Sequence, residues 1–471
     1  MMKSLYKWHH RLGLLVTLPI LGWCISGLTH PIMANFFKIR PAHRTIEVQA
    51  PQLDSTALPL KDILERQEIQ SFQQVRWMRY GGQPYYQIIQ PKQTAVYLHQ
   101  ETGAVLEEGD KVYAQALARH FLGDSSSAIV GIERIEQFTG EYRFINRFLP
   151  VYKVSFDRAD GMDVYVSTES SRLGTMNNNL RKNSMAIFGA LHNWDFLQAW
   201  PNTKTGLMML FMLLGFLTAV SGLWIYGVQW KHFSEKRPNA RHRRWHRRLG
   251  LMVAISTLAF TFSGGYHAFA KTQQEQPQVV PPPMYRPADV VQLPVLKVKF
   301  ADRPVGNVSL VKIEEETFFQ IQWLLQHEPT GYFNAKDLQR ISQGDEQYAL
   351  AQSKLYTRLP DDLVVNTEPI VKFGGEYGFI NKRLPVRKVT YRTPEKHTVY
   401  IETSTGAVAA VIQNSKRLEA LSFLMLHKYH FLDTPLGKKG RDVVIVLVVL
   451  AIMGVHLLGV VLWWRHRKKQ V

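Results

Sequence analysis

The 471-residue chain contains a single cysteine, Cys24. One thiol forms no internal disulfide, and a chain without a Cys-x-x-Cys pair lacks the attachment motif of c-type haems and the motif of thioredoxin-like sites. The sequence also has no Walker motif, no Gly-x-Gly-x-x-Gly fingerprint, no His-Glu-x-x-His pair and no Ser-His-Asp signal. We therefore expect no flavin or nicotinamide site in this chain.

Charged residues are nearly absent from four segments, each long enough to cross a bilayer. The segments are Leu12–Met33, Gly206–Trp230, Leu249–Ala270 and Val443–Trp464. A membrane span needs about 20 predominantly apolar residues. A purely soluble protein is therefore excluded, while the rest of the chain is too polar for the core of a channel or transporter. The first segment is long for a signal peptide and no clear cleavage site follows it, so we expect a retained anchor.

Acidic residues are scarce beside these spans. The net charge of +19 comes mainly from 15 Lys and Arg residues: three before the first span, eight in Lys231–Arg248 and four after the last span, against the single acidic residue Glu235. Short basic flanks stay in the cytoplasm. Both termini and Lys231–Arg248 are therefore predicted to be cytoplasmic, and the two large polar segments periplasmic, in a bacterial inner membrane. The charge is explained by topology, so we do not expect nucleic-acid binding.

Four motifs occur twice, in the same order, at an offset of 237 or 235 residues. They are Trp-His-x-Arg-Leu-Gly-Leu (8–14 and 245–251), Ser-Gly-x-x-His (26–30 and 263–267), Gly-Glu-Tyr-x-Phe-Ile-Asn (140–146 and 375–381) and Leu-His (191–192 and 426–427). The constant offset indicates that one unit occurs twice in the chain. The unit consists of a helix that crosses the membrane to the exported side, a polar domain and a helix that crosses back. Both copies run in the same direction, so the repeat is parallel.

The predicted fold class is a membrane protein with a bundle of four transmembrane helices and two exported α+β domains. Aromatic and β-branched runs such as Pro84–Ile89 and Thr317–Gln322 predict strands, and Asp110–Phe121 and Asp345–Leu355 predict helices. Nine glycines in the spans are expected at helix contacts, namely Gly13, Gly22, Gly27, Gly215, Gly222, Gly250, Gly264, Gly454 and Gly459. The predicted division is 1–35 (helix 1), 36–204 (exported domain 1), 205–230 (helix 2), 231–248 (basic loop), 249–271 (helix 3), 272–440 (exported domain 2), 441–465 (helix 4) and 466–471 (tail).

Several of the 17 histidines lie in or beside the spans. Ionisable groups inside a membrane are functional candidates, and haem b needs two imidazoles facing each other at one depth. His30, His192, His267 and His427 are candidate ligands near the outer surface, and His9, His246 and His456 near the inner surface. By the 235-residue offset, His456 corresponds to Ser221, and we expect His9 or His246 as its partner. The alternative is an interfacial or capping histidine or, for His456, a histidine that hydrogen-bonds a neighbouring helix without a cofactor. Glu141, Tyr142, Glu376 and Tyr377 are more typical of a packing turn than of a site.

These motifs resemble the PepSY-associated transmembrane family, over nearly the whole chain. The resemblance implies PepSY-like exported domains, haem and reduction of a periplasmic ferric siderophore. Ferrous iron leaves hard oxygen ligands far more readily than ferric iron, and a one-electron carrier suits that step. We therefore predict an oxidoreductase with two haems b, a ferric siderophore as substrate, and a quinol or cytoplasmic protein as electron donor. The alternative is a non-enzymatic PepSY-type protein that binds or regulates a periplasmic partner or peptidase. A transporter is disfavoured because the spans lack buried carboxylates and helix breaks.

Overall fold

The computed structural model describes residues 2–45, 58–230, 241–273, 280–300, 305–323 and 330–467. The chain divides into two compact units. Unit 1 comprises Met1–Ile39, Leu180–Gln276 and Ser415–Val471, and unit 2 comprises Arg40–Asn179 and Pro277–Asn414. The chain therefore passes between the units four times. Most of the predicted basic loop, residues 231–240, lies outside the described residues.

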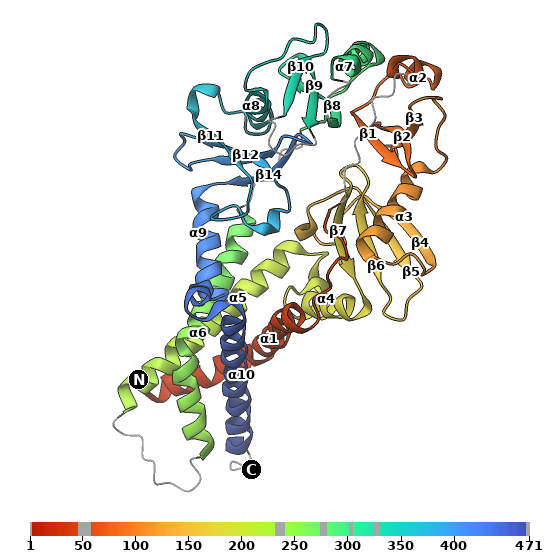
Figure 1. The fold of residues 1–471 in the computed structure, drawn as a ribbon. Coiled ribbons are helices and arrows are strands. Elements are labelled where there is room, and N and C mark those ends of the chain that lie inside the picture. The colour runs from red at the N-terminus through yellow and green to blue at the C-terminus, as the bar shows by residue number, and fades with distance from the viewer. Residues whose placement is uncertain are drawn as a thin grey trace. The chain divides into compact units, whose positions relative to one another are not determined.

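Unit 1 contains four long helices (Figure 1): α1 (Met2–Phe36), α5 (Pro201–Gln229), α6 (Arg241–Thr272) and α10 (Asp433–Arg467). Each is long and apolar enough to cross a membrane, as the sequence predicted. The helices α6 and α10 begin eight and ten residues before the predicted spans. The start of α10 is set off by a kink at Gly437, whose φ of 66° is a left-handed conformation that glycine adopts without a Cβ penalty.

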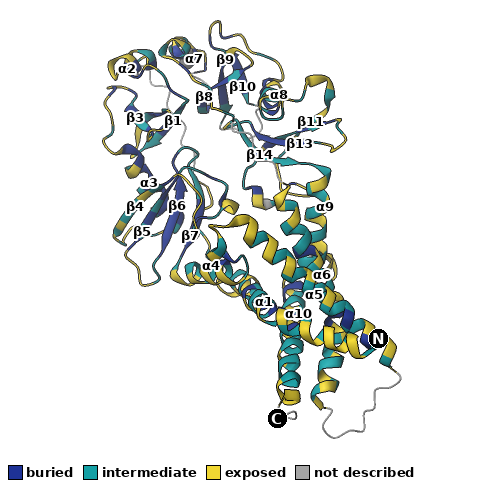
Figure 2. Ribbon diagram, turned by 180° about the vertical axis from the view of Figure 1, so that it is seen from behind, coloured by how far each residue is buried: buried dark blue, intermediate teal, exposed yellow. Residues whose placement is uncertain are grey.

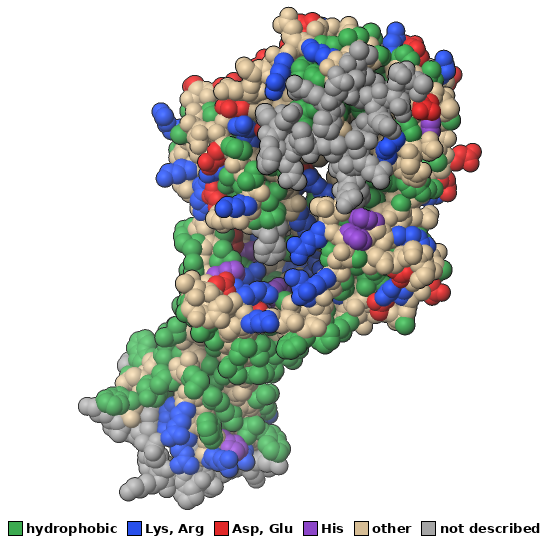
Figure 3. All heavy atoms as spheres, viewed as in Figure 1, with side chains coloured by type: hydrophobic (Ala, Val, Ile, Leu, Met, Phe, Trp, Pro, Cys, Tyr) green, Lys and Arg blue, Asp and Glu red, His purple; other side chains and the backbone are tan. Residues whose placement is uncertain are grey.

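The four helices pack as a ring, because α1 and α6 each contact both α5 and α10. The interior is formed by aliphatic side chains such as Val16, Ile20, Val253 and Ile452. Large apolar side chains such as Leu18, which is 80 % exposed, point outward, and Figures 2 and 3 show this exposed apolar surface along the helices. Apolar side chains that face away from a packed interior are typical of lipid-exposed helices.

Most of the glycines predicted at helix contacts lie against another element of unit 1. A Cβ on any of these seven would lie within 4 Å of a neighbouring element: Gly13, Gly22, Gly215, Gly222, Gly264, Gly454 and Gly459. Gly27 and Gly250 have no such neighbour within 4 Å. The prediction is therefore confirmed for the first seven glycines and wrong for the last two.

Short helical elements precede α5 and α10 and belong to unit 1. They are α4 (Asn179–Leu191), η2 (Asp195–Leu197), α9 (Asn414–Ser422), the π-helical turn η8 (Phe423–His427) and η9 (His430–Leu432). The predicted division places these residues in the exported domains, whereas the structure groups them with the membrane helices. Their amphipathic sequences carry no signal that distinguishes packing on membrane helices from packing on a sheet.

Unit 2 consists of small antiparallel sheets and short helices, which confirms the α+β expectation. In Arg40–Asn179 the sheet β1-β2-β3 is followed by α3 and the sheet β4-β5-β6-β7. In Pro277–Asn414 the sheet β10-β9-β8 is followed by α8 and the sheet β11-β12-β13-β14. The bounds in the first segment are α2 Leu60–Arg66, β1 Gln74–Tyr80, β2 Gln83–Ile89, β3 Val96–His99, α3 Gly109–Leu122, β4 Ile129–Ile135, η1 Phe144–Asn146, β5 Val151–Phe156, β6 Asp163–Ser167 and β7 Arg172–Asn177. Those in the second are η5 Pro287–Val290, α7 Leu293–Lys299, β8 Val305–Ile313, β9 Glu316–Trp323, β10 Gly331–Asn334, α8 Gly344–Thr357, η6 Asp361–Leu363, β11 Val364–Ile370, η7 Phe379–Asn381, β12 Val386–Tyr391, β13 Thr398–Glu402 and β14 Ala407–Ile412.

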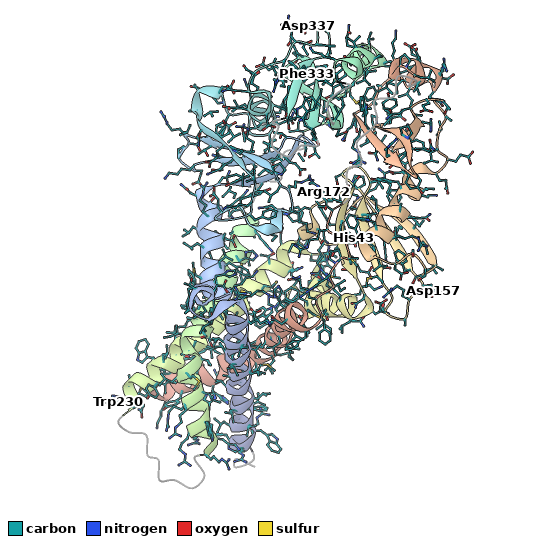
Figure 4. The ribbon with its side chains drawn as sticks, in the orientation of Figure 1. His43, Asp157, Arg172, Trp230, Phe333 and Asp337 are labelled. Atoms are coloured by element: carbon teal, nitrogen blue, oxygen red, sulfur yellow. The ribbon has the colours of Figure 1, made fainter. Side chains whose placement is uncertain are left out.

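The two segments of unit 2 share one hydrophobic core. Phe72 and Tyr285 exchange main-chain hydrogen bonds, and buried side chains from both segments pack around them. A buried ion triad forms a second junction, in which Glu402, with no exposed surface, accepts hydrogen bonds from Arg172 and Arg383. Arg172 belongs to β7 of the other segment (Figure 4). The carboxylate therefore joins the two segments and neutralises part of the buried charge.

Candidate functional site

Two pairs of imidazoles come together within unit 1. The rings of His192 and His427 have centroids 6.5 Å apart, and those of His9 and His246 have centroids 6.4 Å apart. We call the first the outer pair, because it lies near the span ends that continue into unit 2. We call the second the inner pair, because it lies near the starts of α1 and α6.

The outer pair is carried by the segments that precede α5 and α10 and packs against α1 and α6. His192 Nδ1 lies 3.1 Å from Ser26 Oγ on α1, and His427 Nδ1 lies 3.2 Å from Ser263 Oγ on α6. Each ring also stacks on a phenylalanine of its own segment, Phe188 or Phe423. Burial lowers the pKa of His192 to about 4 and that of His427 to about 3, so both rings are neutral at pH 7.

The inner pair is held by α5 and α10. His9 Nδ1 lies 2.9 Å from Ser221 Oγ and 3.2 Å from the carbonyl oxygen of Thr218, both on α5. His246 Nδ1 lies 3.0 Å from the carbonyl oxygen of Val455 on α10. His9 also lies directly over Gly222, where a Cβ would come within 3.0 Å of its Cε1 atom.

The hydrogen-bond partners favour one tautomer of each ring. Ser26 donates its hydroxyl proton to Gly22 O and Ser263 donates to Ala259 O, so each hydroxyl accepts from the Nδ1–H of its histidine. Ser221 donates to Thr218 O, and the carbonyl of Val455 is an acceptor only. With these acceptors, a neutral imidazole at each of the four positions carries its proton on Nδ1 and presents an unprotonated Nε2. This is the state of a histidine that ligates a metal through Nε2 while Nδ1–H bonds to a neighbouring acceptor.

The spacing within each pair suits one metal ion between two Nε2 atoms. A histidine nitrogen ligates a metal at about 2 Å, and the ring centroid lies about 1 Å further back, so two imidazoles on one metal have centroids about 6 Å apart. Both pairs match this distance. Within the described ranges no three His, Cys, Asp or Glu side chains form a metal-binding group, so the donor sets are pairs of imidazoles.

The two pairs lie well apart along the bundle. On α1, 17 residues separate His9 from Ser26, and on α6, 17 residues separate His246 from Ser263. At 1.5 Å per residue this is about 26 Å, close to the thickness of a bilayer's hydrocarbon core. The four helices thus carry one imidazole pair towards each end.

His456 belongs to neither pair. Its Nδ1 lies 3.3 Å from Thr17 Oγ1 on α1, and Thr17 donates its own proton to Gly13 O. We expected His9 or His246 as its partner, but these two histidines pair with each other. The contacts of the inner pair also correct the residue of the first half that corresponds to His456. His9 contacts Gly222, and His246 lies near Gly459. The two histidines are 237 residues apart, as are the two glycines, and by this offset His456 corresponds to Ala219 rather than Ser221.

His30 and His267 have different surroundings from the outer pair. His30 is exposed near the end of α1. His267 hydrogen-bonds Glu419 on α9 and stacks on Phe423. In these positions they flank the outer pair.

Tyr142 and Tyr377 are buried and donate to the main-chain carbonyls of Phe148 and Arg383, as expected of packing turns. Glu141 and Glu376 accept hydrogen bonds from Tyr165 and Tyr400.

Sequence reasoning missed the residues that hold the outer pair. Besides Ser26 and Ser263, these are aromatic residues two positions after each histidine, Trp194 and Tyr429, both with left-handed φ angles, 54° and 51°. Trp194 stacks on Trp23 at 5.5 Å and Tyr429 on Phe260 at 5.3 Å. Non-glycine residues in this conformation cost energy and cluster at functional sites. The recurring Leu-His-x-aromatic spacing was the available signal.

A scan of this sequence against protein-family models and a search of curated proteins both found no match.

Proposed function

We propose that this protein is an inner-membrane reductase that holds two haems b and passes electrons across the membrane to a periplasmic ferric chelate such as a siderophore. The observation that supports it most directly is the presence of two imidazole pairs, each with the spacing and tautomers that bis-histidine ligation requires. His9 and His246 would hold one haem, and His192 and His427 the other.

The chemistry of the haem is reversible one-electron transfer, which a ferric chelate requires. The residues of the chain contribute orientation and solvation. Ser26 and Ser263 hold the Nδ1–H of the outer imidazoles, and the carbonyls of Thr218 and Val455 hold those of the inner imidazoles. Acceptors in these positions fix the ring orientation and raise the basicity of Nε2. All four histidines are partly buried.

Recurring contacts support a tandem parallel repeat as the origin of this arrangement. Matching contacts occur in the two halves of unit 1: Ser26 with His192 and Ser263 with His427; Trp23 with Trp194 and Phe260 with Tyr429; Phe188 with His192 and Phe423 with His427. A repeat explains why each helix pair supplies one imidazole to each site. The resemblance to the PepSY-associated family and the periplasmic location of unit 2 remain predictions.

The optical spectrum of the purified full-length protein tests the proposal. A protein that is red, shows Soret and α bands that sharpen on dithionite reduction, and contains two haems per chain is expected. His192→Ala and His9→Ala should each remove one haem and leave the other, while His99→Ala, a histidine of unit 2, should remove none. Colourless protein from haem-replete cells would overturn the proposal and favour the non-enzymatic alternative.

A further inference from the structure

Two equivalent corners of the chain meet inside unit 2, at the short turns η1 and η7. Arg147 and Lys382 directly follow these turns and lie 235 residues apart in the sequence. Their contacts are reciprocal, because Arg147 Nη2 lies 3.5 Å from Asn381 Oδ1 and Lys382 Nζ lies 3.2 Å from Asn146 Oδ1. We call this place, where the two segments of unit 2 join, the corner junction.

Both cations of the corner junction occupy an unfavourable backbone conformation. Arg147 and Lys382 have left-handed φ angles of 68° and 59°. Glycine adopts this conformation without a Cβ penalty, so an arginine or a lysine here costs energy. Such residues cluster at binding sites, where the side chain has a role that glycine cannot fill.

Two further guanidinium groups lie at the corner junction. Arg172 and Arg383 share the carboxylate of Glu402, and their guanidinium carbons lie 5.9 Å and 5.0 Å from the ring centroid of Phe148. Phe148 directly follows Arg147 in the chain. Arg172 lies on the side of the first segment that faces the second (Figure 4). The carboxylate of this group is therefore already occupied by two guanidinium groups.

Arg147 is a half-buried cation without a carboxylate partner among the described residues. Its hydrogen-bond contacts are with the main-chain oxygen of Ile380 at 3.4 Å and with Asn381 Oδ1 at 3.5 Å, both near the limit for a hydrogen bond. Burial and the nearby Arg383 lower its pKa, which shows that the surroundings disfavour its charge. Its guanidinium carbon lies 4.6 Å from the ring centroid of Phe144, a side chain that is 60 % exposed.

The acidic side chains that precede the two turns bond to other groups. Glu141 pairs with Lys153, and Glu376 accepts a hydrogen bond from Tyr400. Within the described part of the chain, neither carboxylate compensates the charge of Arg147. A half-buried guanidinium beside other cations is costly unless an anion joins it.

We propose that the corner junction binds the ferric chelate and selects chelates of net negative charge, whose carboxylate or catecholate oxygens pair with Arg147 in the field of the three neighbouring cations. This inference rests on the proposed function, because it names the class of substrate. A guanidinium presents two parallel N–H donors, which match a carboxylate or two adjacent catecholate oxygens. The exposed ring of Phe144 offers an apolar contact to the flat arms of a catecholate.

Binding of gallium chelates to the purified full-length protein tests the inference without electron transfer. Gallium(III) has the charge and the ligand preference of ferric iron but is not reduced under these conditions. Its tris-catecholate is trianionic, whereas its tris-hydroxamate is neutral. We expect calorimetry to show binding of the tris-catecholate that weakens as salt is added, and binding of the tris-hydroxamate that is weaker by about tenfold or more.

Substitutions of Arg147 locate the site. Arg147→Gln should weaken binding of the tris-catecholate by about tenfold, because it removes a charge-assisted donor. Arg147→Glu should abolish binding, and Arg147→Lys should retain part of it. Lys111→Gln is the matched control, because this side chain is 49 % exposed and pairs with Glu108 at the surface. The melting temperature of each variant separates loss of the binding group from a fold defect.

Anionic lipid is the other source of such oxygen anions beside a membrane. Vesicles of phosphatidylglycerol should compete with the gallium tris-catecholate no better than vesicles of phosphatidylcholine. Stronger competition by phosphatidylglycerol, equal affinities for the two chelates, or an affinity that Arg147→Gln leaves unchanged contradicts the inference. Absence of haem contradicts the proposed function instead, and the two failures are distinguishable because binding of a gallium chelate is measured independently of haem.

Discussion

Gly222 of α5 lies directly against the ring of His9. A methyl group there would be 3.0 Å from His9 Cε1, whereas one on Gly459 would be 3.6 Å from His246 Cε1, an ordinary contact distance. If the proposed haems are bound, we expect Gly222→Ala to displace His9 and lower the haem-to-protein ratio by up to one haem per chain. Gly459→Ala should retain both haems. Equal ratios in the two variants would show that the inner site does not depend on this close approach.

Glu169 gives unit 2 a pH-dependent stability. Burial and repulsion by Asp110 raise its pKa to about 7 from 4.5, although Arg134 and Arg76 partly offset this. The folded protein therefore keeps a proton that the unfolded chain releases above pH 4.5, and stability falls as pH rises from 4.5 to 7. Glu169→Gln should be more stable than the parent at pH 8 and equal to it near pH 4.

Thermal unfolding from pH 4 to 8 measures this difference. Glu65→Gln is the control, since Glu65 is 56 % exposed. If the parent and Glu169→Gln have parallel pH profiles, the carboxyl is not protonated in the folded protein at neutral pH.

At the level of elements, Glu402 holds two parts of unit 2 together. Glu402→Gln would leave the guanidinium groups of Arg172 and Arg383 without their shared carboxylate. Removing one member of a buried ion network typically costs about 3–5 kcal/mol. We expect a melting temperature lower by at least about 5 °C, given the size of the unit.

The matched control for Glu402 is Asp361→Asn. Asp361 pairs with Lys354 on the surface, where the two side chains are 59 % and 50 % exposed. Exposed pairs contribute little, so no change in melting temperature is expected. Similar melting temperatures for both variants would mean that the triad does not stabilise the junction.

The four membrane helices could be predicted from the sequence, whereas the contacts between their side chains could not. Length and lack of charge identify a span locally, so all four were found in the sequence. The sequence also gives the height of His9 or His246 along its helix. The sequence does not show which faces of the helices contact one another, because these contacts depend on how all four helices pack. The pairing of His9 with His246, and the place of His456 beside Thr17, therefore required the structure.

The outer site shows the same limit at shorter range. His192 and His427 were identified from their recurrence, together with His30 and His267 at the ends of α1 and α6. The π-helical turn and the left-handed Tyr429 orient His427 towards Ser263, and the only sequence signal for this geometry is the recurring aromatic residue two positions after the histidine. Only these contacts separate the exposed His30 and the Glu419-bonded His267 from the paired His192 and His427.

For the whole molecule, the predicted topology is tested with reporter fusions. A reporter after Val471, or within Lys231–Arg248, should be active in the cytoplasm because basic flanks remain there. A reporter in the exposed turn after Gln100, or near Gln343, should be active in the periplasm. An opposite result at any of these positions would contradict the orientation of the spans.

The core that joins the two segments of unit 2 has a consequence for how the molecule can be made. Phe72 and Tyr285 belong to opposite halves of the chain, and their core is continuous across both. Two separately translated polypeptides, divided between residues 235 and 236, would each contain two spans and one segment of unit 2. We expect them to co-purify as a complex when a single tag is placed on one of them. Glu402→Gln should weaken this complex, and recovery of the tagged polypeptide alone would show that a continuous backbone is needed for assembly.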